Sequence, residues 1–273
     1  MDIVEFLTVL YNSGLGYSSI NTARCALSSF LSLGQDKTVG QLPLVKRFLK
    51  GVYNKRPSFP RYEQTWNVDV VLKFLRTLSP VNTLSLQSLT WKLVMLLALV
   101  TGQRVQTLAC LDLTYMKVTD KNVFIQVREI LKSSKPGKHL EPINIPAFVD
   151  DPRLCVVRVL QEYIRRTDDI RKTRKLLITY TKPYREPSVS TISNWIKVVL
   201  LKSGIDISKF KTHSTRSAST TAAFKAGTSV NTILKAAGWK NESVFRKFYN
   251  RPVTVQNYDD NFSVRVLRQN SCI

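Results

Sequence analysis

Apolar residues recur at helical spacing through the first part of the chain, in short stretches broken by glycine. The clearest amphipathic stretches are TARCALSSFLSL and LPLVKRFLKGVY. They predict a small helical module over residues 1–53. The segment that follows, NKRPSFPRYEQTW, combines two prolines with basic and polar residues and predicts a linker over residues 54–65.

A longer series of helices is expected after the linker. The apolar spacing predicts helices over residues 68–77 and 86–101, the second mostly buried and ended by Gly102. Asp151 followed by Pro152 is typical of a helix start and predicts a helix that runs through Arg166.

Strand-like alternation replaces helical spacing between residues 117 and 145. The stretches NVFIQVREIL and LEPINI flank the turn signal SSKPGK, which predicts two or three antiparallel strands. LLITYT, residues 176–181, predicts one more strand. The expected fold class is therefore mainly α with a small antiparallel β-sheet (α+β).

The charge balance indicates an anionic partner. The chain of 273 residues has 41 Lys and Arg against 19 Asp and Glu, a net charge of +22, as expected of a protein that neutralises a polyanion. DNA, RNA and an anionic membrane all fit this balance. The most apolar stretch, Leu93–Val100, is far shorter than the ~20 residues of a membrane-spanning helix, so the membrane is the weaker candidate.

The N-terminus and the cysteines favour an intracellular protein without a metal cofactor. The first residues, MDIVEFLTVLYNSG, have acids before the apolar positions and lack a basic segment, unlike a secretory signal. The four cysteines show no CxxC spacing and only two histidines accompany them, so a metal site is not expected. No cofactor is expected.

Four residue types suited to phosphate chemistry lie between His213 and Tyr249. His213 and Arg216 are three positions apart, so on a helix they face the same way. Arginine offers a fork of donors to a phosphate, and histidine exchanges protons near neutral pH. Trp239 adds an indole donor, and Tyr249 a phenol that becomes a nucleophile on losing its proton. An isolated HxxR pair is more often structural, so the rest of the chain must support this interpretation.

The paired aspartates of the chain lie in loop-like or capping contexts, so they do not predict the carboxylate set of a metal-dependent nuclease. A site built from basic side chains fits the sequence better.

Five motifs occur together in the order found in tyrosine recombinases. They are TGQR at 101–104, a hairpin lysine in LKSSKPGKH, HSTR at 213–216, GW at 238–239 and FYNRP at 248–252. The resemblance covers nearly all of residues 66–255, which is the expected catalytic domain. Residues 1–53 resemble a shortened helical core-binding domain of that family, and residues 256–273 would form a tail. The AGW and FRKFYNRP stretches are most similar to recombinases of eukaryotic DIRS-like or Crypton mobile elements.

The resemblance implies a role for each motif residue. Arg104 and Arg216 would clamp the scissile phosphate, His213 would transfer a proton, and Trp239 would donate to a phosphate oxygen. Tyr249 would attack the phosphate and form a 3′-phosphotyrosine link without metal or ATP. Lys132, near the end of the first hairpin strand, would protonate the leaving 5′ oxygen. Lys135 and Lys138 lie in or beyond the turn and stay open as alternatives to Lys132.

The implied function is site-specific DNA recombination, for integration of a mobile element. The implied partners are double-stranded DNA and further copies of the chain, as a homotetramer on two DNA sites, with no membrane and no small-molecule substrate. A nuclear location follows from the resemblance to eukaryotic elements. Candidate DNA-contacting residues are Lys135, Lys138, Arg24, Lys46 and Arg47.

The sequence departs from the family pattern at two positions. Phe248 stands where many members have the tyrosine, so Tyr249 must be accommodated by a bulge or a longer loop. Thr107 stands where many members have an acid after the first arginine, so Arg104 is expected to be oriented by other partners.

Two other classes of protein fit parts of the pattern. AAFKAGTSVNTILKAAGW is also typical of a helix-turn-helix, which a DNA-binding protein without catalysis, including a domesticated recombinase, would have. A type IB topoisomerase shares the tyrosine chemistry, although the short N-terminal module and the recombinase wording disfavour it.

Overall fold

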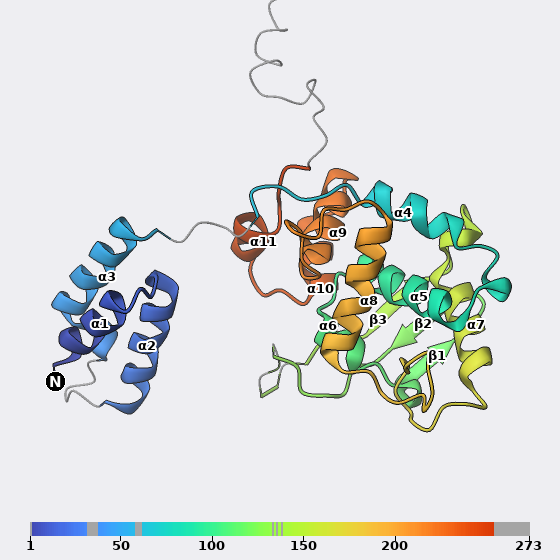
Figure 1. The fold of residues 1–273 in the computed structure, drawn as a ribbon, viewed down its shortest axis with the longest axis horizontal. Coiled ribbons are helices and arrows are strands. Elements are labelled where there is room, and N and C mark those ends of the chain that lie inside the picture. Colours follow the sequence, from blue (N-terminus) through green and yellow to red (C-terminus); the bar gives the residue numbers. More distant parts are fainter. Residues whose placement is uncertain are drawn as a thin grey trace, which may run out of the picture. The chain divides into compact units, whose positions relative to one another are not determined.

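The chain folds into two compact units, Met1–Arg61 and Tyr62–Ile273. The computed structural model in Figure 1 describes residues 2–31, 38–57, 62–132, 134, 136–137 and 139–253. The division falls inside the segment predicted as a linker. The roles predicted for the domains stay predictions, and the predicted tail over residues 256–273 lies outside the described residues.

The first unit is helical, as its sequence predicts. It contains α1 (Ile3–Asn12), α2 (Tyr17–Phe30), the 3₁₀ turn η1 (Val39–Gln41) and α3 (Pro43–Lys55). Asp2 and Glu5 form a capping box that fixes the start of α1. The three α-helices contact one another around a small apolar core. Its buried members are Leu7, Ile20, Val39, Val45, Leu49 and Val52.

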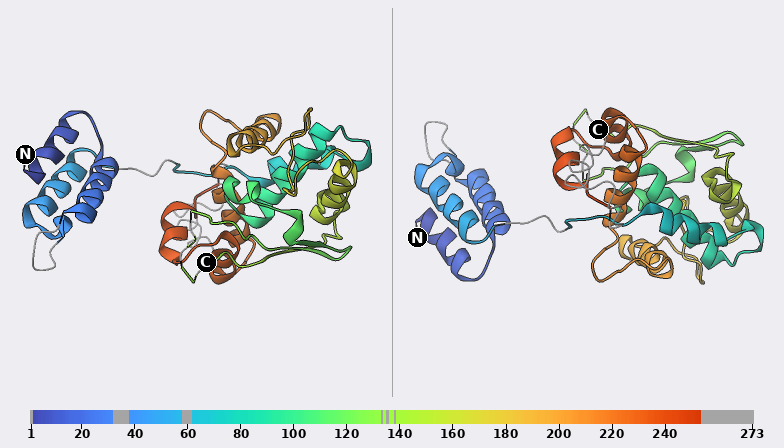
Figure 2. Two further views of the ribbon diagram at one scale, coloured as in Figure 1. Left: turned by 90° about the horizontal axis from the view of Figure 1, so that it is seen from below. Right: turned by 90° about the horizontal axis from the view of Figure 1, so that it is seen from above.

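The second unit is built around one buried helix, α5 (Leu86–Thr101), visible in Figures 1 and 2. Ser85 caps its first turn, and Gly102 ends it in the left-handed conformation at φ 58°. Because its residues are apolar on nearly every face, α5 is enclosed by other helices. It contacts α7 (Val156–Thr167), α8 (Val189–Lys202) and α9 (Ser214–Lys225).

Shorter elements complete the second unit. They are α4 (Val68–Thr77), η2 (Val81–Thr83), α6 (Val105–Ala109), η3 (Leu113–Tyr115), η4 (Pro152–Leu154), α10 (Val230–Ala237) and α11 (Glu242–Phe248). None of the helices in the described part of the chain has the length and apolar character to cross a membrane.

A three-stranded antiparallel sheet lies beside these helices. Its strands are β1 (Met116–Val118), β2 (Asn122–Ile125) and β3 (Ile143–Pro146), in the order β1-β2-β3. β3 contacts α5 and α7, and alternate residues such as Val123 and Ile125 are buried. The predicted fold class, mainly α with a small antiparallel sheet, is confirmed.

The strand predicted for residues 176–181 is wrong. None of residues 176–181 lies in a strand or a bridge, and the preceding Lys175 forms an isolated bridge with Asp112. Leu176, Leu177 and Ile178 are buried, and the Ile178 N–H donates to the Tyr163 hydroxyl at 3.0 Å instead of to a strand. Burial against α7 therefore explains the apolar, β-branched composition that resembled a strand.

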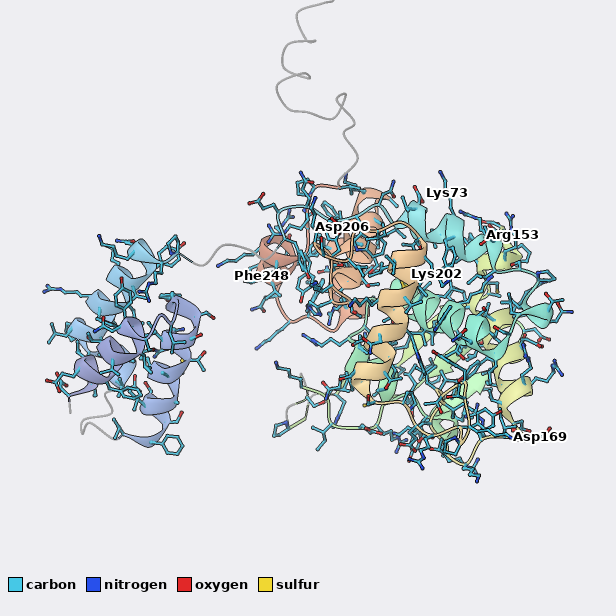
Figure 3. All side chains as sticks on the ribbon, in the orientation of Figure 1. Lys73, Arg153, Asp169, Lys202, Asp206 and Phe248 are labelled. Carbon is cyan, nitrogen blue, oxygen red and sulfur yellow. The ribbon has the colours of Figure 1, made fainter. Side chains whose placement is uncertain are left out.

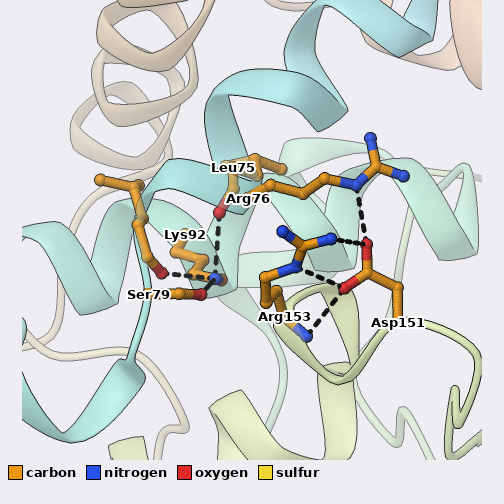
Figure 4. Close-up of polar contacts among 7 residues, drawn as sticks. Leu75, Arg76, Ser79, Lys92, Asp151 and Arg153 are labelled. Atoms are coloured by element: carbon orange, nitrogen blue, oxygen red, sulfur yellow. Dashed lines mark hydrogen bonds and ion pairs between the residues drawn. The ribbon is translucent and has the colours of Figure 1, made fainter.

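The helix predicted to start at Asp151 begins later. Asp151 caps the 3₁₀ turn η4, and α7 starts at Val156. The Asp151 carboxylate also accepts from Arg153 Nε at 2.8 Å and from Arg76 Nε at 2.7 Å (Figure 4). These hydrogen bonds, from Arg153 and then Arg76, hold the pKa of Asp151 far below its usual range. The aspartate thus ties α4 to the start of α7.

A fully buried lysine caps the C-terminal end of α4. Lys92, on α5, donates from Nζ to the carbonyls of Leu75 at 3.0 Å and Leu78 at 2.5 Å, and to Ser79 Oγ at 3.2 Å (Figure 4). Carbonyls in the last turn of a helix lack partners within the helix, and a cation there is favoured by the helix dipole. Burial lowers the pKa of Lys92 to about 8, with Asp151 opposing and Arg153 reinforcing the change.

We expect the folded protein to gain stability relative to Lys92→Met as pH rises from about 8 towards 10.5, the ordinary value for lysine. In this window the unfolded chain still binds the proton that the folded protein has lost, so the free energy of unfolding increases with pH, by about 2–3 kcal/mol. Urea unfolding of both proteins across this range measures the difference. Lys73→Met, at an exposed lysine of α4 (Figure 3), is the matched control. A Lys92→Met difference that does not change with pH contradicts the expectation.

Candidate active site

Helix α9 carries two of the predicted site residues. His213 is its N-cap, and Arg216 lies in its first turn, so both project from the same end, as their spacing predicts. This end is anchored by Trp66, whose Nε1 donates to Ser214 Oγ at 2.9 Å. His213 is exposed, whereas Arg216 is only 2% exposed.

Only one nitrogen of the Arg216 guanidinium has a hydrogen-bond partner among the described residues. Its Nη2 donates to the Ala237 carbonyl at 2.7 Å, at the C-terminal end of α10. Its Nε and Nη1 are buried and have no hydrogen-bond partner among the described residues. Buried charged donors without partners are costly. The two unpartnered donors of Arg216 are therefore suited to an anion such as a phosphate.

A second arginine adds charge beside Arg216. Arg104 follows the left-handed Gly102 and is the N-cap of α6. Burial first, and then the charge of Arg104, lower the pKa of Arg216 to about 10, while Tyr249 acts in the opposite direction. This value is still far above neutrality, so Arg216 is a cation at physiological pH.

The turn that carries Arg104 is attached to the same helix end as Arg216. Gln103 Nε2 donates to the Ala236 carbonyl at 2.5 Å, one residue before the carbonyl that holds Arg216. Thr107, the departure from the family's acid, is buried. Within the described residues no hydrogen bond joins the Arg104 guanidinium to a protein acceptor. Gln103 therefore holds the turn in place but does not orient the Arg104 side chain.

Trp239 lies against both Arg216 and Tyr249. Its ring is 4.8 Å from Arg216 Cζ and its centroid is 4.2 Å from that of Tyr249, distances typical of cation–π and aromatic contacts. Gly238, in the left-handed conformation at φ 65°, turns the chain from α10 to the tryptophan. Trp239 Nε1 is buried without a partner among the described residues, which makes it a second donor available to an anion.

The structure brings Tyr249, and not Phe248, to this cluster. Tyr249 is the C-cap residue of α11, and its hydroxyl lies 3.2 Å from His213 Nε2. Phe248 is the last residue of the helix and is 51% exposed (Figure 3). The tyrosine is one position later than in many family members, and the end of α11 accommodates this shift. The chain leaves helical geometry there, at Tyr249 (φ −124°, ψ −29°).

Hydroxyl groups of α9 hold the backbone of the tyrosine. The Tyr249 carbonyl accepts from Ser217 Oγ at 2.9 Å and from Thr221 Oγ1 at 2.8 Å. Neither residue was predicted from the sequence, and nor was Gln103. The spacing of Ser217 and Thr221 from His213, four and eight positions, places them on the same helical face and could have indicated them.

Lys132 makes no contact with the other predicted site residues within the described part of the chain. The prediction that it lies near the end of a strand is wrong, because β2 ends at Ile125 and Lys132 is an exposed residue of the segment before β3. In this segment Leu131 is buried and its N–H donates to Ser134 Oγ at 3.0 Å, and not to a strand carbonyl. Lys135 and Lys138 lie outside the described residues.

The other candidate DNA contacts belong to the first unit. Lys46 and Arg47 are exposed on α3. Arg24 is partly buried on α2, where its Nε donates to Asn21 Oδ1 at 3.0 Å.

Together these side chains can bind an oxyanion and attack it. Two arginines and an indole N–H supply donors, and a phenol lies within hydrogen-bonding distance of an imidazole. Among the described residues, no three His, Cys, Asp or Glu side chains are grouped as metal ligands would be.

Comparison with known proteins agrees with this geometry. The model of the phage integrase family matches residues 67–254, which is more than half of the chain. No curated protein sequence matches the chain.

Several solved structures share the fold. The XerH site-specific recombinase, in a post-cleavage complex with its difH substrate, has a TM-score of 0.61 and 14% identity over 99% of this chain and 71% of XerH. The Tn1549 transposon integrase, in complex with transposon right end DNA, has a TM-score of 0.62 and 14% identity over 97% of this chain and 83% of that one. A lambda integrase dimer on a core site has a TM-score of 0.53 and 18% identity over 91% of this chain and 63% of the integrase.

Identities this low show only a shared fold. The match to the family model shows that the chain is a member of the family. The chain belongs to the phage integrase family and is an enzyme of the tyrosine recombinase class.

Proposed function

We propose that this protein is a site-specific recombinase that cuts and rejoins DNA through a 3′-phosphotyrosine intermediate and integrates a mobile element. One observation carries the proposal: the Tyr249 hydroxyl lies 3.2 Å from His213 Nε2, beside the buried Arg216 with its two unpartnered donors. A nucleophile, a proton acceptor and anion-binding donors therefore lie close together.

Phosphate binding is the first step. Nonbridging phosphate oxygens accept from the unpartnered donors of Arg216, Nε and Nη1, and Trp239 Nε1 and Arg104 supply further positive potential. In a buried site such donors stabilise the charge that develops on the phosphate in the transition state.

In the attack, Tyr249 Oη forms a bond to phosphorus while the bond between phosphorus and the 5′ oxygen breaks. The phenolic proton passes to His213 Nε2, for which the 3.2 Å separation is suitable. The leaving 5′ oxygen takes a proton from Lys132, which leaves a free 5′ hydroxyl. The reverse step, attack by a 5′ hydroxyl on the phosphotyrosine, reseals the strand. One ester replaces another at each step, so no external energy source is consumed.

Charge and the neighbouring structures support DNA as the substrate. The net charge of +22 suits a polyanion, and the XerH and Tn1549 structures are complexes with their own DNA sites. A lambda integrase tetramer bound to a Holliday junction also shares the fold, which supports a homotetramer on two DNA sites. The Tn1549 integrase belongs to a transposon, which supports a mobile-element role. The support for a nuclear location is the similarity of motif wording to eukaryotic elements.

Tyr249→Phe should abolish covalent attachment to nicked suicide DNA that contains an element end, because phenylalanine has no nucleophilic oxygen. Denaturing gels of protein with labelled DNA measure the adduct. Phe248→Leu, at the exposed neighbouring position, is the control and should retain adduct formation. If the wild-type protein forms no adduct on any element-end DNA, the enzymatic proposal is wrong. Relaxation of supercoils without strand exchange would favour a topoisomerase.

Lys132→Ala should slow cleavage of ordinary DNA by about 10²–10⁴-fold, the usual contribution of a general acid. DNA with sulfur in place of the bridging 5′ oxygen should restore the rate, because a thiolate leaves without protonation. Single-turnover cleavage of the two substrates gives the comparison. Rescue by sulfur in Lys135→Ala or Lys138→Ala, and not in Lys132→Ala, would assign the acid to the other lysine.

DNA affinity should fall steeply with salt. If about six phosphates are neutralised, the association constant decreases by about 10³-fold between about 50 and 200 mM salt. Titrations of labelled duplex at several salt concentrations measure the slope. An affinity that is nearly independent of salt would contradict the role given to the basic surface.

A further inference from the structure

Two hydroxyl groups on α9 are directed at the nucleophile's backbone and not at their own helix. Ser217 and Thr221 are 5% and 0% exposed, and both donate to the Tyr249 carbonyl, at 2.9 and 2.8 Å. The usual behaviour of a serine or threonine inside a helix is to bond the carbonyl four residues earlier. Their neighbour Thr220 does this, donating to the Arg216 carbonyl at 2.6 Å.

The bonds satisfy a carbonyl that a helix end leaves without partners. Tyr249 is the C-cap of the short helix α11, so no later turn supplies an N–H to its carbonyl. The two hydroxyls fill both acceptor positions of that oxygen. Thr221 Oγ1 also accepts from the Arg251 N–H at 3.3 Å, so a single side chain binds the backbone on both sides of residue 250.

Both backbone polar groups of Tyr249, its N–H and its carbonyl, therefore have hydrogen-bond partners. Its N–H donates to the Phe245 carbonyl at 2.9 Å, and its carbonyl is held by α9. Only the side-chain torsions of Tyr249 then remain to be set, and these are limited by the Trp239 ring and by the contact with His213. The helix that holds the carbonyl is also the helix of His213 and Arg216.

We infer that Ser217 and Thr221 are positioning residues, which hold Tyr249 in line with the phosphate bound by Arg216. This inference rests on the proposed function of Tyr249 as the nucleophile. Neither hydroxyl takes part in bond making or proton transfer. Both act through the Tyr249 backbone, by keeping the reacting oxygen on the same rigid element as the phosphate-binding groups.

The test compares single-turnover adduct formation on nicked suicide DNA for Ser217→Ala, Thr221→Val and the double variant. Loss of one neutral hydrogen bond should slow adduct formation about fivefold, and loss of both about twentyfold. DNA affinity should stay within about twofold of the wild type, because both hydroxyls are bonded to the Tyr249 carbonyl and neither belongs to the proposed phosphate-binding groups. Thr221→Ser keeps the hydroxyl and should cleave within about twofold of the wild-type rate.

Thr220→Val is the matched control. It removes a hydroxyl that is also buried, at 6% exposure, on the same helix, but one that bonds only to helix carbonyls. Its rate should lie within about twofold of the wild type, while thermal unfolding reports the structural cost of each change. If the double variant does not fold, the single variants with Thr221→Ser provide the comparison.

Three outcomes would overturn the inference. The double variant could form adduct at the wild-type rate, Thr220→Val could slow cleavage as much as Thr221→Val, or Thr221→Ser could fail to preserve the rate. These results are distinct from failure of the proposed function, in which the wild-type protein itself forms no adduct.

Discussion

The arrangement of the second unit depends on the burial of one charged side chain. A guanidinium that is 2% exposed is costly unless its donors are matched, and Arg216 has a matched donor at the Ala237 carbonyl. That carbonyl ends α10, where the helix dipole favours a cation. The position of α10 against α9 therefore determines which donors of the arginine remain for a ligand, and the turn through Gly238 sets Trp239 over the same group.

Elements whose ends are set by neighbouring residues were predicted correctly. The helices over residues 68–77 and 86–101 match α4 and α5, because Ser85 and Gly102 are local signals that act within one turn. The existence of a small antiparallel sheet followed in the same way from alternation around a turn. The predictions were wrong where a group distant in the sequence, and not a neighbouring residue, satisfies the backbone. For residues 176–181 this group is the Tyr163 hydroxyl, which takes the N–H that a strand partner would have taken.

The site shows the same division. Motif order indicated Arg104, His213, Arg216, Trp239 and Tyr249, and the helical spacing of His213 and Arg216 indicated a shared face. No periodicity could show that the tyrosine hydroxyl reaches the histidine, since the two come from separate helices. Gln103, Ser217 and Thr221 were missed for a related reason. Their roles lie in hydrogen bonds to backbone carbonyls far along the chain, and a carbonyl leaves no signature in the sequence.

The segment that enters the second unit contacts the segment that follows Tyr249. The Thr65 N–H donates to the Pro252 carbonyl at 2.7 Å, Thr65 forms a parallel bridge with Val253, and the adjacent Trp66 bonds Ser214 beside His213. Tension applied to the chain before residue 62 would therefore act on the backbone three residues after Tyr249 and, through Trp66, on the residue after His213. The segment that enters the second unit is therefore mechanically connected to the residues beside both His213 and Tyr249.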